Sequence, residues 1–197
     1  MRRPSAGLAL VAAAVALVAG CGTGAGLTPS TPVPVTAGPM PVLAASAVPG
    51  LAVSTRSLPA EQLAKDATIH DLRAQLSADG YVAGRERTFQ GPSHQLTLVT
   101  SRALSFASPT GAAAFLAYVH AHAEQWFGLT TSVSALDSAG RQGWLFHPPA
   151  CACHLANPLY VGVVRDGRQL AWLSINGPTA TTTVLDRLLA PDRSTTT

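Results

Sequence analysis

The chain has 197 residues, of which 47% are hydrophobic and only 12% are charged, whereas soluble domains usually have about 25% charged residues. No charged residue occurs from Pro4 to Thr55, and nearly every charge lies between Arg56 and Arg193. This separation excludes a uniform globular chain. It indicates a leader and a linker without charges, followed by one domain.

Residues 1–20 have the pattern of a signal peptide. A short positive region, Arg2 and Arg3, precedes an apolar run at 8–19 that is rich in Ala, Val and Leu. The run is shorter than the about 20 residues that cross a bilayer as a helix. We therefore expect a signal peptide here rather than a membrane-spanning helix.

The end of this leader resembles the lipobox of bacterial lipoproteins. Residues 17–21 read Leu-Val-Ala-Gly-Cys, with a branched residue, two small residues and then cysteine. In that family the cysteine receives a diacylglyceryl thioether, becomes the mature N-terminus and is usually N-acylated as well. The resemblance implies that Cys21 carries palmitate or similar acyl chains, which anchor the protein on the extracytoplasmic face of the cell membrane. The alternative is an ordinary secretory signal in which the cysteine occurs by chance.

Net charge and residue usage bear on the class of partner and on the class of protein. Cleavage before Cys21 leaves eleven basic and ten acidic residues, so the net charge of the mature chain is about +1. A nearly neutral domain lacks the basic surface of a nucleic-acid-binding protein, so we expect no nucleic-acid partner. The single lysine, Lys65, among twelve arginines, together with abundant Ala, Gly and Pro, resembles the cell-envelope lipoproteins of actinobacteria.

The segment at 21–56 is predicted to be a disordered linker behind the lipidated cysteine. It is rich in Pro, Ala, Thr and Gly and shows no hydrophobic periodicity, so it offers too little apolar surface to offset the entropy of ordering. The last residues, 191–197, are predicted to be a disordered tail. Between them, residues 57–190 form the expected globular domain.

Hydrophobic periodicity predicts the elements of this domain in chain order. A helix over 59–79 ends before Gly80, and two strands follow at 81–89 and 95–105. Ser108 and Pro109 have the pattern of a helix N-terminus, and the second helix runs to Gly128.

Strands are also predicted in the second half of the domain, at 131–136, 143–146, 159–164 and 169–175. The last two are joined by Asp166 and Gly167, a pair typical of a tight type I′ hairpin turn. A final helix follows Gly177 and Pro178. The order predicts a single α+β domain with a mainly antiparallel sheet and about three helices packed on it. It loosely resembles the PsbP-like α/β/α sandwiches.

The segment 147–154 contains the densest group of reactive side chains, two thiols and two imidazoles. Cys151 and Cys153, with His147 and His154, supply the ligand types that Cu(I) and Zn(II) prefer. In an oxidising compartment two remaining cysteines instead favour a disulfide. Because one residue separates them, that bond needs a kinked backbone and would be easier to reduce. A structural disulfide, a metal site, a redox-active pair and free or intermolecular thiols therefore all stay open.

Other candidate sites are weaker. His120 and His122 lie about 200° apart around a helix, so they cannot share one ion within it. No nucleophile motif, phosphate-binding loop or dinucleotide-binding glycine pattern occurs, and we expect no resident cofactor and no enzyme activity. Four aromatic residues are either core residues or the lining of an apolar pocket: Phe115, Trp126, Trp144 and Trp172.

The sequence thus predicts a lipid-anchored, extracytoplasmic, non-enzymatic protein that binds a small ligand or a protein partner at the cell envelope. The alternative is a metal-binding or thiol-redox envelope protein that uses His147, Cys151, Cys153 and His154.

Overall fold

The computed structural model describes residues 42–67, 69–92, 95–149 and 157–190, and these all fall within one compact unit of the chain. This part of the chain contains seven strands and five helices. The strands are β1 (Ala52–Leu58), β2 (Tyr81–Gln90), β3 (Leu98–Phe106), β4 (Ser132–Ser138), β5 (Arg141–His147), β6 (Leu159–Asp166) and β7 (Gln169–Asn176). The helices are α1 (Ala60–Ala67), α2 (Leu72–Ala78), α3 (Pro109–Ala121), α4 (Ala123–Phe127) and α5 (Thr182–Leu189).

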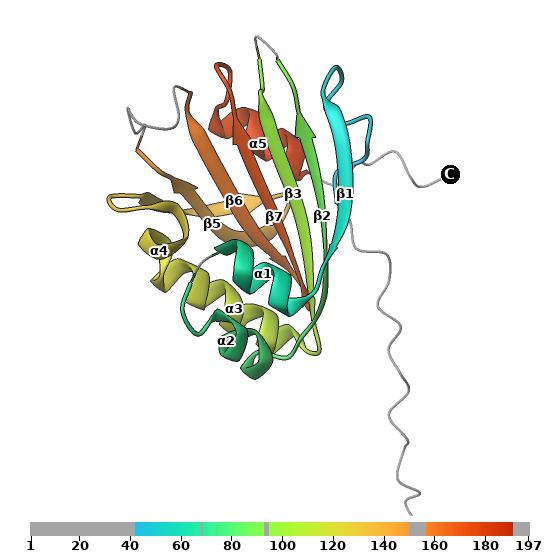
Figure 1. The fold of residues 1–197 in the computed structure, drawn as a ribbon. Helices are drawn as coiled ribbons and strands as arrows, with labels where there is room; N and C mark the ends of the chain where they lie inside the picture. The colour runs from blue at the N-terminus through green and yellow to red at the C-terminus, as the bar shows by residue number, and fades with distance from the viewer. Residues whose placement is uncertain (1–41, 68, 93–94, 150–156, 191–197) are drawn as a thin grey trace, which may run out of the picture. The chain divides into compact units, whose positions relative to one another are not determined.

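The strands form one antiparallel sheet in the order β1-β2-β3-β7-β6-β5-β4. Hairpins join β2 to β3, β4 to β5, and β6 to β7, while β3 pairs with β7 at the centre of the sheet. Figure 1 shows helices α1 to α4 in front of the lower half of the sheet and α5 behind it. The upper half of the front face carries no helix in this view.

Each face of the sheet has its own hydrophobic core. The front core lies under α1 to α4 and includes Leu72, Phe106, Phe115 and Trp172. The back core lies under α5 and residues 42–51, and it includes Phe89 and Ile175. Successive side chains of a strand point to opposite faces of the sheet. This alternation decides which polar residues of neighbouring strands share a face and can contact each other.

The predicted α+β class and antiparallel sheet are confirmed, but the helices are shorter and more numerous than expected. The helix predicted over 59–79 is interrupted before α2, where Asp71 adopts a left-handed conformation with φ of 65°. The helix predicted to reach Gly128 is likewise divided at His122, which ends α3 and precedes α4. Apolar spacing continues through both breaks because all four helices cover the same face, so periodicity alone could not locate them.

The structure also places ordered residues within the range 21–56 that composition assigned to a linker. Strand β1 begins at Ala52, and residues 43–51 supply part of the back core. Residues 52–57 are all exposed, so β1 has no apolar alternation that sequence analysis could detect. Within the described ranges, no helix is both long and apolar enough to span a membrane.

Candidate functional site

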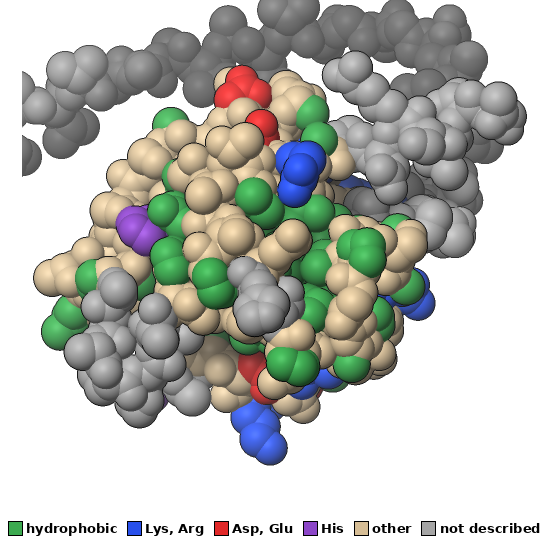
Figure 2. Space-filling view, turned by 90° about the horizontal axis from the view of Figure 1, so that it is seen from above, with side chains coloured by type: hydrophobic (Ala, Val, Ile, Leu, Met, Phe, Trp, Pro, Cys, Tyr) green, Lys and Arg blue, Asp and Glu red, His purple; other side chains and the backbone are tan. Residues whose placement is uncertain are grey.

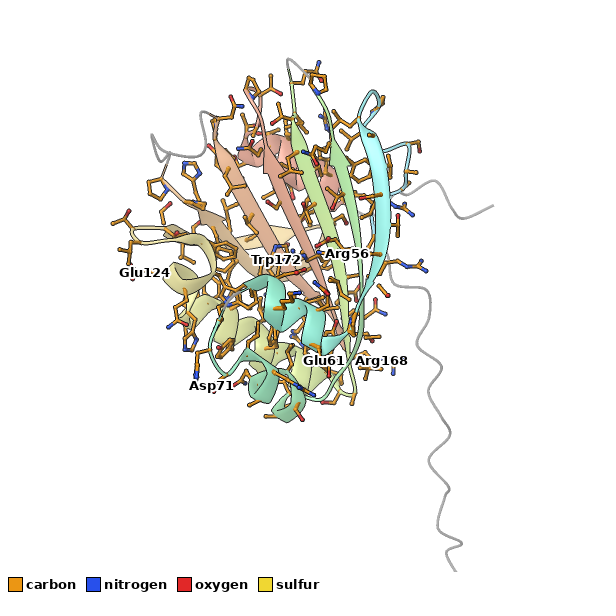
Figure 3. All side chains as sticks on the ribbon, in the orientation of Figure 1. Arg56, Glu61, Asp71, Glu124, Arg168 and Trp172 are labelled. Atoms are coloured by element: carbon orange, nitrogen blue, oxygen red, sulfur yellow. The ribbon has the colours of Figure 1, made fainter. Side chains whose placement is uncertain are left out.

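One row of side chains crosses the front face of the sheet and includes the buried carboxylate of Glu86. The strand register aligns Arg56 on β1, Glu86 on β2, Arg102 on β3 and Trp172 on β7. Figure 3 shows Arg56 and Trp172 at the same level of the sheet, just above α1. Antiparallel pairing thus brings together residues that are up to 116 positions apart in the chain.

Glu86 is the centre of an ion cluster. Its Oε1 accepts a hydrogen bond from Arg56 Nε at 2.7 Å, and its Oε2 accepts one from Arg102 Nε at 2.6 Å. Arg56 also donates from Nη2 to Asp66 on α1 at 2.6 Å. The Glu86 side chain is only 6% exposed, so these two arginines replace the water that the carboxylate loses. The cluster ties β1, β2, β3 and α1 together.

Burial and pairing act in opposite directions on the Glu86 carboxyl. Burial raises its pKa, but the hydrogen bond from Arg56 and the charge of Arg102 outweigh burial, and the net pKa lies below the usual range. The hydrogen bond to Glu86 likewise raises the pKa of Arg56. Glu86 therefore stays ionised at neutral pH, and both of its oxygens are occupied.

Trp172 continues the row from the ion cluster into an aromatic cluster. Its ring lies 5.6 Å from Arg102 Cζ, 5.1 Å from the ring of Trp126 and 5.6 Å from the ring of Phe127. Trp172 is 3% exposed, whereas Trp126 is half-buried. The small helix α4, which supplies Trp126 and Phe127, thus covers one side of Trp172.

Two side chains that contact Trp172 have donor groups for which the described part of the chain offers no acceptor. Among the described residues, no acceptor binds the Nε1 of Trp126, although this atom is buried. Within the described ranges Arg102 donates only through Nε, so both of its Nη groups can meet solvent or a ligand, and its side chain is 18% exposed. An unpaired buried donor costs about 1–3 kcal/mol, so an acceptor that reached the Nε1 of Trp126 would be stabilised.

Four hydroxyls extend this surface over the uncovered half of the front face. The register places them side by side on four neighbouring strands: Ser54, Thr88, Thr100 and Ser174. They are exposed or half-buried, and none has a hydrogen-bond partner within the described part of the chain. We call Arg102, Trp126, Trp172 and the four hydroxyls the Arg102 surface. Figure 2, which looks onto the upper end of the sheet, shows mostly uncharged side chains with few scattered charges.

Most of the sequence-predicted site residues lie outside the described ranges: Cys21, Cys151, Cys153 and His154. His147 is described at the end of β5, where its ring stacks on Tyr160 at 4.3 Å and its Nδ1 lies 2.8 Å from the carbonyl oxygen of Leu159. No three His, Cys, Asp or Glu side chains in the described segments are grouped as metal ligands. The predicted disulfide and metal site therefore stay predictions.

The other histidines contact separate partners. His120 stacks on Trp144 at 3.9 Å, and His122 packs against Tyr118 at 4.2 Å. Phe115 and Trp172 are buried core residues, whereas Trp126 and Trp144 are half-buried and pack against the same core. The four aromatic residues singled out in the sequence therefore belong to or border one core.

Sequence analysis missed the ion cluster. Glu86 and Arg102 lie on predicted strands, but their charges look like those of solvated residues in a one-dimensional pattern. The sequence held one sign that Glu86 faces the core. Gly84 and Glu86 share one face of the strand and alternate with Arg85 and Arg87 on the other. Only the pairing of β2 with β3 shows that the buried face includes a charge pair.

Two hollows lie away from the Arg102 surface. An open depression between α1 and α2 is lined by Ile69, Asp71 and Arg73 among others. A smaller one lies between residues 47–51 and α5. Neither includes an unpaired buried donor, so the Arg102 surface offers the stronger chemical reason for binding.

Comparisons with known proteins add little to this geometry. No family model and no curated protein matches the chain. Among solved structures, the extracellular domain of PknH from Mycobacterium tuberculosis is similar over 70% of this chain and 78% of that chain, with 12% identity and a TM-score of 0.31. A likeness of this size assigns neither fold nor function.

Proposed function

We propose that this protein is a non-enzymatic lipoprotein, anchored through Cys21 on the extracytoplasmic face of the cell membrane, whose domain binds a small ligand at the Arg102 surface. The alternative within this proposal is that a protein partner, rather than a small ligand, binds at the Arg102 surface. The observation that carries it is that two side chains in contact with Trp172 have donors without a partner among the described residues, Trp126 at its buried Nε1 and Arg102 at its Nη groups.

The location is supported by the sequence at 1–21, where a positive region, a short apolar run and the lipobox-like end follow one another. Residues 22–41 contain repeated prolines and no charge, which suits an extended tether between the anchor and the domain. A domain held in this way can meet ligands or partners close to the membrane surface.

The chemistry of the surface favours binding over catalysis. Both oxygens of Glu86 are bound by arginines and its pKa is lowered, which makes it a poor general base at neutral pH. Two arginines and two carboxylates make the cluster neutral overall. The surface therefore suits a neutral ligand with several hydrogen-bonding groups, since hydroxyls both donate and accept.

Lipidation is tested by replacing Cys21 with serine. We expect fatty-acid label to enter the wild-type protein and to be absent from Cys21→Ser, which should also leave the membrane fraction more readily because it has no acyl chains. The measurement is metabolic labelling with an alkyne palmitate, followed by fractionation. Equal labelling of both proteins would refute Cys21 as the anchor.

Ligand binding is tested by native mass spectrometry of the full chain purified in mild detergent. A ligand that co-purifies should appear as an added mass on the wild-type protein. Its affinity for Arg102→Lys should be at least about tenfold lower, because lysine keeps the charge beside Glu86 but loses the planar guanidinium with its several donors. Arg187→Lys is the matched control, since Arg187 is exposed on α5 behind the sheet. Equal weakening in both variants would place the ligand elsewhere.

The metal-binding or thiol-redox alternative is favoured by one observation. A carbonyl oxygen can only accept, so the contact with Leu159 places the proton of neutral His147 on Nδ1 and leaves Nε2 available as a ligand. The same spectra would then show a metal adduct that weakens in His147→Gln, or thiols at Cys151 and Cys153 that alkylate without reduction. A metal-free protein whose thiols alkylate only after reduction would contradict the metal form.

A further inference from the structure

The free edge of β1 has few of the features that normally protect an edge strand from pairing. Sheet edges are commonly blocked by proline, by outward charges, by bulges or by very short strands. The seven residues Ala52–Leu58 include no proline, and their register with β2 is continuous. Residues 52–57 are all exposed.

The one charged residue of β1 guards the edge only weakly. Arg56 bonds to Glu86 on β2 and to Asp66 on α1, so its guanidinium is directed over the sheet rather than away from it. In the described part of the chain, no segment other than β2 forms backbone hydrogen bonds with Ala52–Leu58. Apart from the carbonyl of Leu58, which accepts from Tyr81, the outward backbone groups of β1 have no partner among the described residues, so another strand can pair with them.

We propose that β1 is a homodimerisation edge, at which β1 of a second copy pairs antiparallel across a twofold axis and joins two sheets into one. An extended strand is the occupant that satisfies a row of alternating backbone donors and acceptors. The proline-rich residues 22–41 suit this position poorly, because proline lacks the N–H that a ladder needs. A second copy supplies the same unblocked strand, and a twofold contact closes after two chains.

The register follows from symmetry and charge. In the joined sheet, residues directly opposite each other across the two β1 strands must point to the same face. The twofold axis therefore passes between one residue of β1 and the same residue of the second copy. Centring on Thr55 pairs all seven residues and places Ser54 opposite Arg56 of the second copy. Centring on Arg56 would put two like charges opposite each other, which is unfavourable.

The test uses the full chain in its membrane fraction and reads disulfide cross-linking on a non-reducing gel. Thr55→Cys should give a dimer band under mild oxidation, because Cβ atoms directly opposite across antiparallel strands are about 4.5–5.5 Å apart. Ala135→Cys is the matched control, at the exposed centre of the other edge strand, β4. Wild type reports any background from Cys151 and Cys153.

Two substitutions of opposite charge at Ser54 then test the register. Adding Ser54→Lys to Thr55→Cys places a lysine opposite Arg56 twice in the dimer, and we expect about tenfold less cross-linking. Ser54→Glu in the same background should retain the band. Both positions are exposed, so circular dichroism should report the same fold for all variants. No Thr55 band, an equal Ala135 band, or a Thr55 band unaffected by Ser54→Lys would each overturn the proposal.

Discussion

Glu86→Gln should lower the free energy of unfolding by about 2–3 kcal/mol at pH 7. Breaking a buried ion pair costs about 3–5 kcal/mol, and we reduce this because Arg56 is 46% exposed and its pairing is screened by water. A glutamine can accept from one arginine, but its amide nitrogen then faces the donors of the other. Urea unfolding of the two proteins measures the difference.

The same substitution should also remove the contribution of Glu86 to the pH dependence of the free energy of unfolding. The folded-state pKa of Glu86 is lowered, so its contribution to stability is present above the unfolded pKa, about 4.3, and is lost as pH falls through the folded pKa. The gap between wild type and Glu86→Gln should therefore be largest near neutral pH and should narrow below about pH 4.

Glu61→Gln is the control for this result. Glu61 pairs with Arg73 at 3.0 Å, but the two side chains are 61% and 72% exposed. An exposed pair contributes little, so this variant should change stability by less than about 1 kcal/mol at every pH. If the gap for Glu86→Gln were the same at pH 3 and pH 7, the ionised carboxylate would not be its source.

Local sequence patterns predicted the elements whose signals are local. The Asp166–Gly167 turn between β6 and β7 and the Ser108 cap of α3 are both present, and Ser108 Oγ accepts from Gly111 N at 3.0 Å. Each depends on residues within a few positions of one another. Their physical cause is therefore visible in a short window of sequence.

The Arg102 surface could not be predicted in this way. Arg56, Glu86, Arg102 and Trp172 meet only because β1, β2, β3 and β7 are neighbours, and β7 reaches β3 across the three strands between them in the chain. Strand order is a non-local property that a single sequence does not specify. The aromatic residues were identified, but whether they packed together or lined a pocket depended on the same strand order.

Trp172→Ala should be the most destabilising single change at this surface, with a loss of about 3–5 kcal/mol in the free energy of unfolding. Trp172 is 3% exposed and contacts Arg102, Trp126 and Phe127, so its removal opens a cavity between the sheet and α4. Urea unfolding should show the loss, and near-ultraviolet circular dichroism should weaken because Trp126 loses its ring partner.

Trp144→Ala separates a specific role of Trp172 from the general cost of losing a tryptophan. Trp144 lies in the same cross-sheet row, but it is half-buried and its ring stacks on the exposed His120. Because less surface is buried and one side can refill with water, we expect less than half the loss seen for Trp172→Ala. An equal loss would mean that the cost of Trp172→Ala is the general one of removing a tryptophan from this core, and that the contacts of Trp172 with Arg102, Trp126 and Phe127 add nothing to it.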